Sequence, residues 1–174
     1  MTTSPSFSTR EARLLEIWQS HEHAEFVAKE PLAALATMTD HPHVLLVPTG
    51  LGGIGWAGVR HFYEHDFIPH IPEDMRPTLL SITVGHDRVV EESVFEFTHS
   101  VEMPWLLPGV RATRQPVRLG VVVVVQFEGE KIAHEHLYYD HAALLAQVGL
   151  LSTGPLGIAG RQGASKLLEL GRKG

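Results

Sequence analysis

The stretch "KIAHEHLYYDH" (131–141), followed by "AALLAQVGLL" (142–151), marks a change from a strand pattern to a helix pattern. The first part is rich in aromatic residues and alternates, whereas the second carries apolar residues at helical spacing. Alternation gives the strand two faces, one with Ile132, His134, His136, Tyr138 and Asp140 and the other with Ala133, Glu135, Leu137 and Tyr139. Because neither face is wholly apolar, the polar groups lie either on a wet or oligomer-facing surface or in a pocket, and periodicity supports both interpretations equally.

Helix patterns dominate the first part of the chain. Residues 8–30 begin with a Ser/Thr cap and repeat apolar side chains about every 3.6 residues, which predicts a long amphipathic helix. Pro31 can open a short second helix, and residues 43–49 form a strand pattern before a glycine-rich turn at 50–55. A third helix is predicted from residue 55, with one apolar face made by Val59, Phe62, Tyr63 and Phe67.

The remaining chain changes to long strand patterns. Four of them are joined in part by hairpin-like turns at "GHDR" and "EGEK", and they cover residues 78–87, 88–103, 117–130 and 131–141. Helices followed by consecutive strands indicate an α+β domain, with helices packed on one face of a curved antiparallel sheet. The concave side of such a sheet is a natural site for a small-molecule pocket.

Composition fits one globular domain. Of the 174 residues, 44% are hydrophobic and 20% are charged, so a packed core is expected. The boundaries we predict are a flexible tail at 1–8, a domain at 9–151 and a C-terminal extension with a short helix at 152–174. With no cysteine, the sequence excludes a disulfide scaffold, a thiol nucleophile and thiolate metal sites.

The net charge and the hydropathy pattern limit the kinds of partner that the protein is expected to bind. A formal net charge of −6 without a basic cluster argues against nucleic-acid binding. The N-terminus lacks a signal-peptide pattern, and the run "LGVVVVVQF" (119–127) falls well short of the roughly 20 residues that span a bilayer. We therefore expect a cytoplasmic protein with no membrane partner.

Twelve histidines make metal binding a hypothesis to weigh. His61 and His65 have the helical spacing of a zinc pair, but Phe62 stands where the zincin motif has its glutamate. His134 and His136 share a strand face and are the better pair, although the sequence assigns them no third ligand. Solvated or core histidines explain these patterns more simply, so no metal site is predicted, and a site around His134 and His136 is kept as a third possibility.

For the predicted strand at 88–103 it is equally open which of its two faces is buried. Glu92, Val94, Glu96 and Thr98 share one side, and Ser93, Phe95, Phe97 and His99 share the other. A carboxylate buried there without a partner would be costly, so an inward Glu92 or Glu96 would need a histidine or tyrosine opposite it. No G-x-S-x-G nucleophile motif is present in the sequence.

Several of these features together resemble the SnoaL-like polyketide cyclase family of the NTF2-like superfamily. Thr98-His99 matches a Thr-His at the end of a strand, and Glu130-Lys131-Ile132 stands for the family's Gly-Lys-Ile. Tyr139-Asp140 matches the aromatic–Asp end of the last strand, and residues 144–149 match its final Leu-x-x-Gln helix. The resemblance covers about residues 10–151, with Phe97 in place of a glycine and "ATRQ" (112–115) in place of Pro-Thr-Gly.

The resemblance implies an NTF2-like cone, with about three N-terminal helices in the concave face of a strongly curved antiparallel sheet. It also implies a homodimer through the sheet and cyclase chemistry that needs no metal or cofactor. The family's general base is an aspartate at the end of the last strand, which corresponds to Asp140. The histidine that assists it is unmatched, because the neighbouring strand offers only Gln126, so His99 or His136 would take that role.

We therefore predict cofactor-free acid–base chemistry of a cyclase, isomerase or hydrolase type on an unknown hydrophobic small molecule. Asp140, His136 and His99 are the predicted catalytic residues, whereas His134 and Glu135 are expected at the sheet surface or an interface. The predicted substrate-binding residues are Trp56, Phe62, Tyr63, Glu92, Phe95, Trp105 and Tyr138. The alternative is a non-catalytic ligand-binding or dimeric scaffold protein with the same fold.

Overall fold

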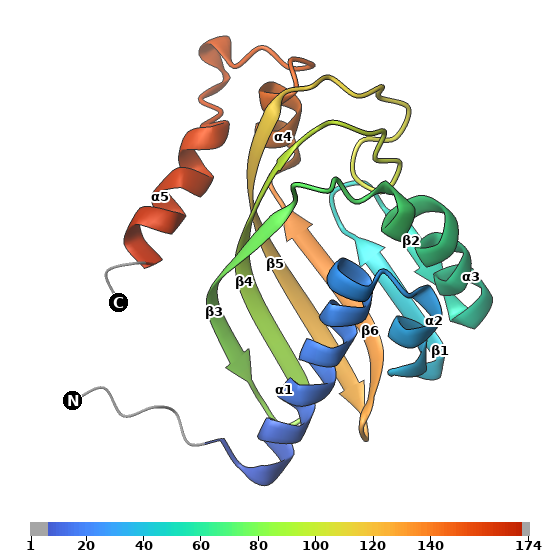
Figure 1. The fold of residues 1–174 in the computed structure, drawn as a ribbon. Helices are drawn as coiled ribbons and strands as arrows, with labels where there is room; N and C mark the ends of the chain where they lie inside the picture. The colour runs from blue at the N-terminus through green and yellow to red at the C-terminus, as the bar shows by residue number, and fades with distance from the viewer. Residues whose placement is uncertain (1–6, 172–174) are drawn as a thin grey trace.

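The computed structural model describes residues 7–171, which form a six-stranded sheet and helices on both of its faces (Figure 1). The strand order is β2-β1-β6-β5-β4-β3. The strands span Met38–Leu46 (β1), Leu51–Ile54 (β2), Arg76–Val84 (β3), Arg88–Thr98 (β4), Pro116–Glu128 (β5) and Lys131–Tyr139 (β6). The predicted α+β cone is confirmed, and its sheet is open rather than closed.

One pairing differs from the expected antiparallel sheet. Strand β1 runs parallel to β6, whereas the other neighbours are antiparallel. Strands β3 to β6 follow one another along the chain, and each pairs with the next in the opposite direction. About half of the chain, residues 47–130, separates β1 from β6, so no hairpin imposes opposite directions on this pair.

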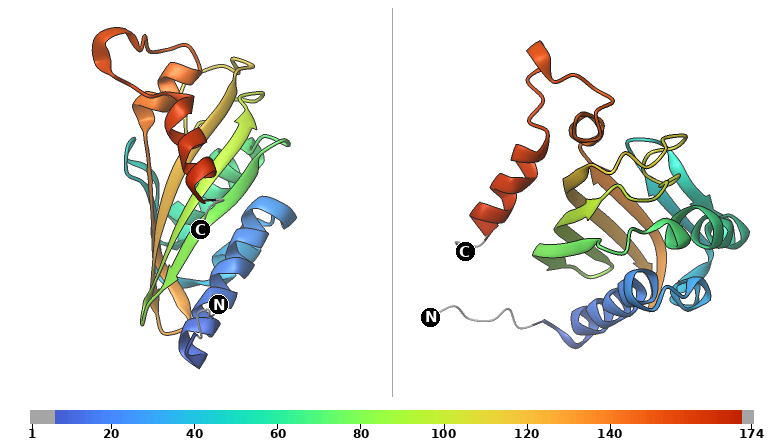
Figure 2. Two further views of the ribbon diagram at one scale, coloured as in Figure 1. Left: turned by 90° about the vertical axis from the view of Figure 1, so that its left-hand side faces the viewer. Right: turned by 45° about the horizontal axis from the view of Figure 1, so that its top comes forward.

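The helices cover both sides of the sheet (Figures 1 and 2). They span Thr9–Glu22 (α1), Pro31–Ala36 (α2), Gly55–His61 (α3), His141–Gln147 (α4) and Arg161–Gly171 (α5). Ser8 and Glu11 close a capping box at the start of α1. Two π-helical turns, His23–Ala28 (η1) and Phe62–Phe67 (η2), continue α1 and α3. The expected long first helix therefore changes its winding after Glu22. Among the described helices, none combines the length and apolar character needed to cross a bilayer.

The glycine-rich segment at 50–55 is more than the expected turn. It contains the short strand β2, which pairs with β1. A Cβ on Gly53 would lie 2.4 Å from the carbonyl oxygen of Gly58 in α3. Only glycine therefore lets the helix approach the strand this closely.

The C-terminal extension packs on the outer face of the sheet. Ala164 and Leu168 of α5 form a small buried cluster with Val94 of β4. This places α5 opposite the N-terminal helices, away from the concave side that holds the main core. Dimerisation through the sheet stays a prediction, which sedimentation of the purified protein would test.

Candidate functional site

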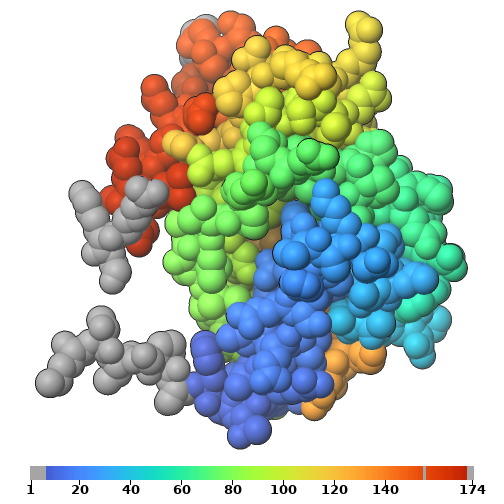
Figure 3. Space-filling model, viewed as in Figure 1, coloured from blue at the N-terminus to red at the C-terminus, as the bar shows by residue number. Residues whose placement is uncertain are grey.

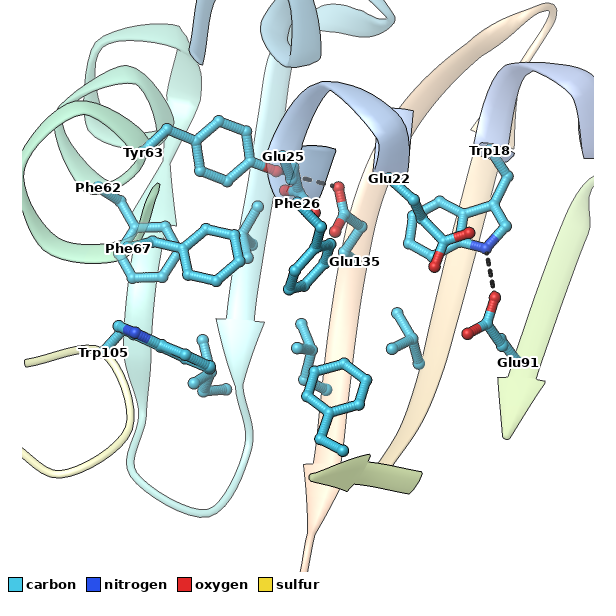
Figure 4. A pocket seen from close by; sticks show the side chains of 15 residues that line it. Trp18, Glu22, Glu25, Phe26, Phe62, Tyr63, Phe67, Glu91, Trp105 and Glu135 are labelled. Atoms are coloured by element: carbon cyan, nitrogen blue, oxygen red, sulfur yellow. Dashed lines mark hydrogen bonds between the residues drawn. The ribbon is translucent and has the colours of Figure 1, made fainter. Parts of the chain in front are cut away.

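A pocket lies between the concave face of the sheet and the helical segments α1, η1 and η2. Its cavity volume is about 30 Å³, and the free space among the lining side chains, open solvent included, is about 460 Å³. The surface is hollowed where the N-terminal helices meet the neighbouring segment coloured green (Figure 3). The lining residues are Trp18, Glu22, Glu25, Phe26, Val44, Leu46, Phe62, Tyr63, Phe67, Glu91, Phe95, Trp105, Val123, Glu135 and Leu137 (Figure 4).

Aromatic side chains form one wall of this pocket. Phe26 meets Phe67 and Phe95 edge-on, with ring centroids 5.8 and 5.7 Å apart. Trp105 packs edge-on against Phe67 at 4.9 Å. Phe26 and Phe67 lie on the two π-helical turns, a kind of irregularity that often accompanies functional sites. The wall favours a ligand with an apolar or aromatic portion.

A buried imidazole joins two glutamates at the back of the pocket. His21 Nε2 lies 3.0 Å from Glu135 Oε1 and 3.2 Å from Glu25 Oε1. The Tyr63 hydroxyl donates to Glu135 Oε1 at 3.3 Å. His21 and Tyr63 are fully buried, and the two glutamates nearly so.

The hydrogen bonds of His21 indicate that its ring is protonated. The Thr37 hydroxyl donates its only proton to the Ala34 carbonyl, so it must accept from His21 Nδ1–H, 2.7 Å away. On the other side, Nε2 faces carboxylate oxygens that accept. Burial lowers the pKa of His21, but the charges of Glu135 and Glu25 outweigh it and raise that pKa well above 6.5. The cluster is an imidazolium held between two acidic groups.

A second acidic pair lies at the other end of the pocket, beside Trp18 (Figure 4). Glu91 accepts a hydrogen bond from Trp18 Nε1 at 2.9 Å and another from Ser93 Oγ at 2.5 Å. Burial, the charges of Glu91 and Glu25 and a hydrogen bond with Glu91 raise the pKa of Glu22 to about 9. At neutral pH the Glu22 carboxyl group therefore keeps its proton in this pocket, next to Glu91, which accepts two hydrogen bonds.

We expect Glu22→Gln to stabilise the protein by about 2–3 kcal/mol at pH 7. In the folded state the Glu22 carboxyl group keeps its proton from pH 4.5 up to about 9, whereas in the unfolded state it releases the proton near pH 4.5. Stability from this group is thus full below pH 4.5 and is lost as pH rises toward 9. Urea unfolding of the variant and the parent protein at pH 5, 7 and 9 measures the difference in their free energies of unfolding. A change no larger than that of Glu16→Gln, an exposed position on the same helix, would contradict the prediction.

Four of the seven predicted substrate-binding residues line the pocket: Phe62, Tyr63, Phe95 and Trp105. The other three lie elsewhere. Trp56 is 41% exposed on α3. Glu92 and Tyr138 line a groove on the outer face beside α5, because alternation turns them away from Glu91 and Leu137. The predicted division of β4 into two faces is confirmed, with Phe95 on the pocket side and Glu92 opposite.

The three predicted catalytic residues do not line this pocket. The Asp140 carboxylate is exposed and accepts from the Ala143 backbone N–H at 2.9 Å, as the N-cap of α4. His136 lies on the outer face, and the buried His99 contacts Thr113 Oγ1 through Nδ1 at 3.0 Å. Of the two open interpretations of the β6 face that carries His136 and Asp140, the structure supports the outer surface, because Glu135 and Leu137 line the pocket on the concave side. The catalytic roles of Asp140, His136 and His99 stay predictions.

Asp140→Ala should destabilise the protein by about 1 kcal/mol, because it removes an N-cap. Asp140→Asn keeps a capping oxygen and should cost much less. Chemical denaturation of both variants separates capping from other roles. Equal losses in the two variants would show that the carboxylate charge, and not the cap, is what matters.

The sequence interpretation missed the acidic lining of the pocket. Glu135, expected at the surface, is 3% exposed and faces His21. A signal was present, since His21 and Glu25 continue the apolar face of Leu14 and Trp18 at helical spacing. Polar residues on the apolar stripe of a helix are buried together with it, so they need partners across the core.

Comparison with known proteins gives the fold. Neither a family model nor a curated protein matches the sequence. The fold resembles a proposed SnoaL-like polyketide cyclase from Jannaschia sp. CCS1, with a TM-score of 0.68 and 14% identity over 86% of this chain and 100% of that one. A proposed polyketide cyclase from Xanthomonas campestris pv. campestris gives a TM-score of 0.62 and 21% identity over 81% and 100%.

A third similar structure is a protein with a ketosteroid isomerase-like fold from Catenulispora acidiphila DSM 44928, in complex with trimethylamine. Its TM-score is 0.59, with 18% identity over 78% of this chain and 94% of that one. At these identities the likeness concerns the fold. This chain has the NTF2-like fold that SnoaL-like polyketide cyclases and ketosteroid isomerase-like proteins share.

Proposed function

We propose that this protein catalyses a proton transfer on a small organic molecule held in the concave pocket, by acid–base chemistry between Glu91 and Glu22. The observation that carries the proposal is the pairing of two carboxyl groups in one partly apolar pocket, one of them with a pKa of about 9. Carboxyl groups whose environments differ in this way can divide the roles of acid and base.

Glu91 is the proposed base. Trp18 and Ser93 each hold one of its carboxylate oxygens, which fixes the plane of the group toward the pocket. The base takes a proton from a carbon next to a carbonyl group, and the C–H electrons pass into an enolate. Glu22 donates its hydrogen bond to the oxygen on which this negative charge develops. Returning the proton to another carbon isomerises the substrate, whereas attack of the enolate on a second carbonyl closes a ring.

The His21, Glu25 and Glu135 cluster is proposed to position the substrate. Glu25, Glu135 and Tyr63 line the pocket, whereas His21 holds the two glutamates from behind. Burial and the neighbouring acidic groups raise the pKa of Tyr63 well above 10, so its hydroxyl keeps its proton as a donor. Solved structures with this fold include proposed polyketide cyclases.

The proposal is tested by proton exchange. Enolisable ketones and β-dicarbonyl compounds with an aromatic portion are incubated with the protein in D₂O, and deuterium at the α-carbon is followed by NMR. We expect exchange above the buffer rate for compounds that bind. Compounds that bind the pocket without any faster exchange would contradict catalysis.

A second candidate is binding of a small organic cation. The pocket carries four glutamates with aromatic rings close by, and among its described lining residues there is no lysine or arginine. Aromatic faces and carboxylates together attract ammonium groups. The similar structure from Catenulispora holds trimethylamine. Saturable binding of trimethylammonium, lost in Glu91→Gln, together with no exchange activity, would favour this candidate.

A further inference from the structure

Three histidines meet on the face of the sheet opposite the pocket. His43 comes from β1, and His134 and His136 come from β6. The parallel register places His43 directly beside His134. Alternation then brings His136 to the same face, two residues along the strand. In the sequence, His134 and His136 share one strand face. The third member, His43, comes from a strand about 90 residues earlier, so only the tertiary structure brings it beside the other two.

The ring nitrogens of this outer cluster converge. The two Nε2 atoms of His43 and His136 are 2.9 Å apart. The His134 ring stacks on both others, with centroids 4.5 Å from His43 and 4.4 Å from His136. One nitrogen from each of the three histidines lies within 4.8 Å of the others. Two nitrogens on one tetrahedral Zn²⁺ are about 3.3 Å apart, so the spacing of these donor atoms is close to that of a metal site, and the stacked rings would turn to point at one ion.

The outer cluster is open to solvent. All three residues are partly exposed, so an ion can reach them from solvent.

Two other groups of titratable residues suit a cation less well. His21, Glu25 and Glu135 also place donor atoms within 4.8 Å, but both nitrogens of His21 already carry hydrogens that are bonded to protein groups. His61 and His65 lie side by side on one helical surface, with ring centroids 4.7 Å apart, and supply only two ligands. The outer cluster has three ligands and no competing carboxylate among them.

We propose that His43, His134 and His136 form a binding site for a divalent transition-metal cation such as Zn²⁺, separate from the pocket. Three imidazoles without oxygen ligands favour Zn²⁺ and its neighbours over Mg²⁺ or Ca²⁺. A fourth position would be taken by water or an anion. Because the ligands come from β1 and β6, the ion would tie the parallel strand pair together, and removing it should lower the unfolding temperature.

The test uses the full chain without a histidine tag, stripped of metal by a chelator. Calorimetric titration with ZnCl₂ should give one ion per chain, and Co²⁺ should give the visible absorption of a low-coordinate site. Each of His43→Gln, His134→Gln and His136→Gln should weaken binding at least about tenfold, since each removes one of three protein ligands. His61→Gln/His65→Gln is the matched control and should bind as the parent protein does.

Three outcomes would overturn the site: no stoichiometric binding, binding that survives the triple glutamine variant, or binding lost in the His61/His65 control. The parent protein is also examined alone, because a variant that unfolds would lose binding for that reason. Addition of Zn²⁺ should shift the ring-nitrogen NMR signals of three histidines. Signals that stay unchanged, or a shift of the His21 signals instead, would equally exclude the outer cluster.

Discussion

His21→Leu is expected to lower the free energy of unfolding by about 3–5 kcal/mol, the loss typical when one partner of a buried ion pair is removed. The ring is fully buried between Glu25 and Glu135, and leucine fills much of its volume without supplying its charge. The two acidic groups would then face each other without a cation. Binding a proton relieves the repulsion between the two carboxylates, so the variant should be least stable at high pH, where protons are scarce.

Urea unfolding of a short series separates charge from packing. His23→Leu, an exposed position two residues along, is the matched control and should change stability by less than about 0.5 kcal/mol. Adding Glu25→Gln and Glu135→Gln to His21→Leu should recover part of the loss, because no unpaired charge remains. A loss that the added glutamines leave unchanged would mean that packing, and not charge, accounts for it.

Glu91→Gln is expected to reduce kcat by a factor of about 10²–10⁴, the usual contribution of a general base. Glutamine has nearly the same shape and can still accept the Trp18 N–H, so the pocket should keep its form while losing the group that takes the proton. KM should change much less than kcat. The α-carbon exchange reaction measures this directly, with the pocket ligand identified by that screen.

Glu92→Gln supplies the control for this prediction. It changes the next residue of β4, whose side chain lies on the opposite face and contacts Ser81. Activity in this variant should match that of the parent protein. If Glu92→Gln and Glu91→Gln reduce exchange equally, the effect comes from the strand and not from the pocket carboxylate. If Asp140→Asn alone abolishes exchange, the base predicted from the family resemblance is the right one.

Much of the fold follows from local patterns. The capped α1, the long strands β3 to β6 and the α4 helix after Asp140 all appear where periodicity and turn residues indicate them. Such elements depend on neighbouring residues, so sequence spacing predicts them well. The strand β2 was missed because its glycines give no apolar alternation, and Gly53 is required by the close approach of α3.

Only some of the residues that line the pocket could be predicted from the sequence. Of the aromatic lining residues, Phe62, Phe95 and Trp105 were predicted, because large apolar residues are mostly buried. The acidic groups were not, because alternation shows that Glu135 and His136 lie on opposite faces but does not say which face is concave.

By itself, the sequence determined most of the helices and strands, their order and the α+β class, since these depend on local periodicity. Only the tertiary structure decided which side of each strand the helices cover, and this assigned Glu91 and Glu135 to the pocket and the three histidines to the outer face. Contacts such as His21 with Glu135 join residues more than 100 positions apart. Their chemistry comes from burial and proximity, which exist only once the sheet has curved around the helices.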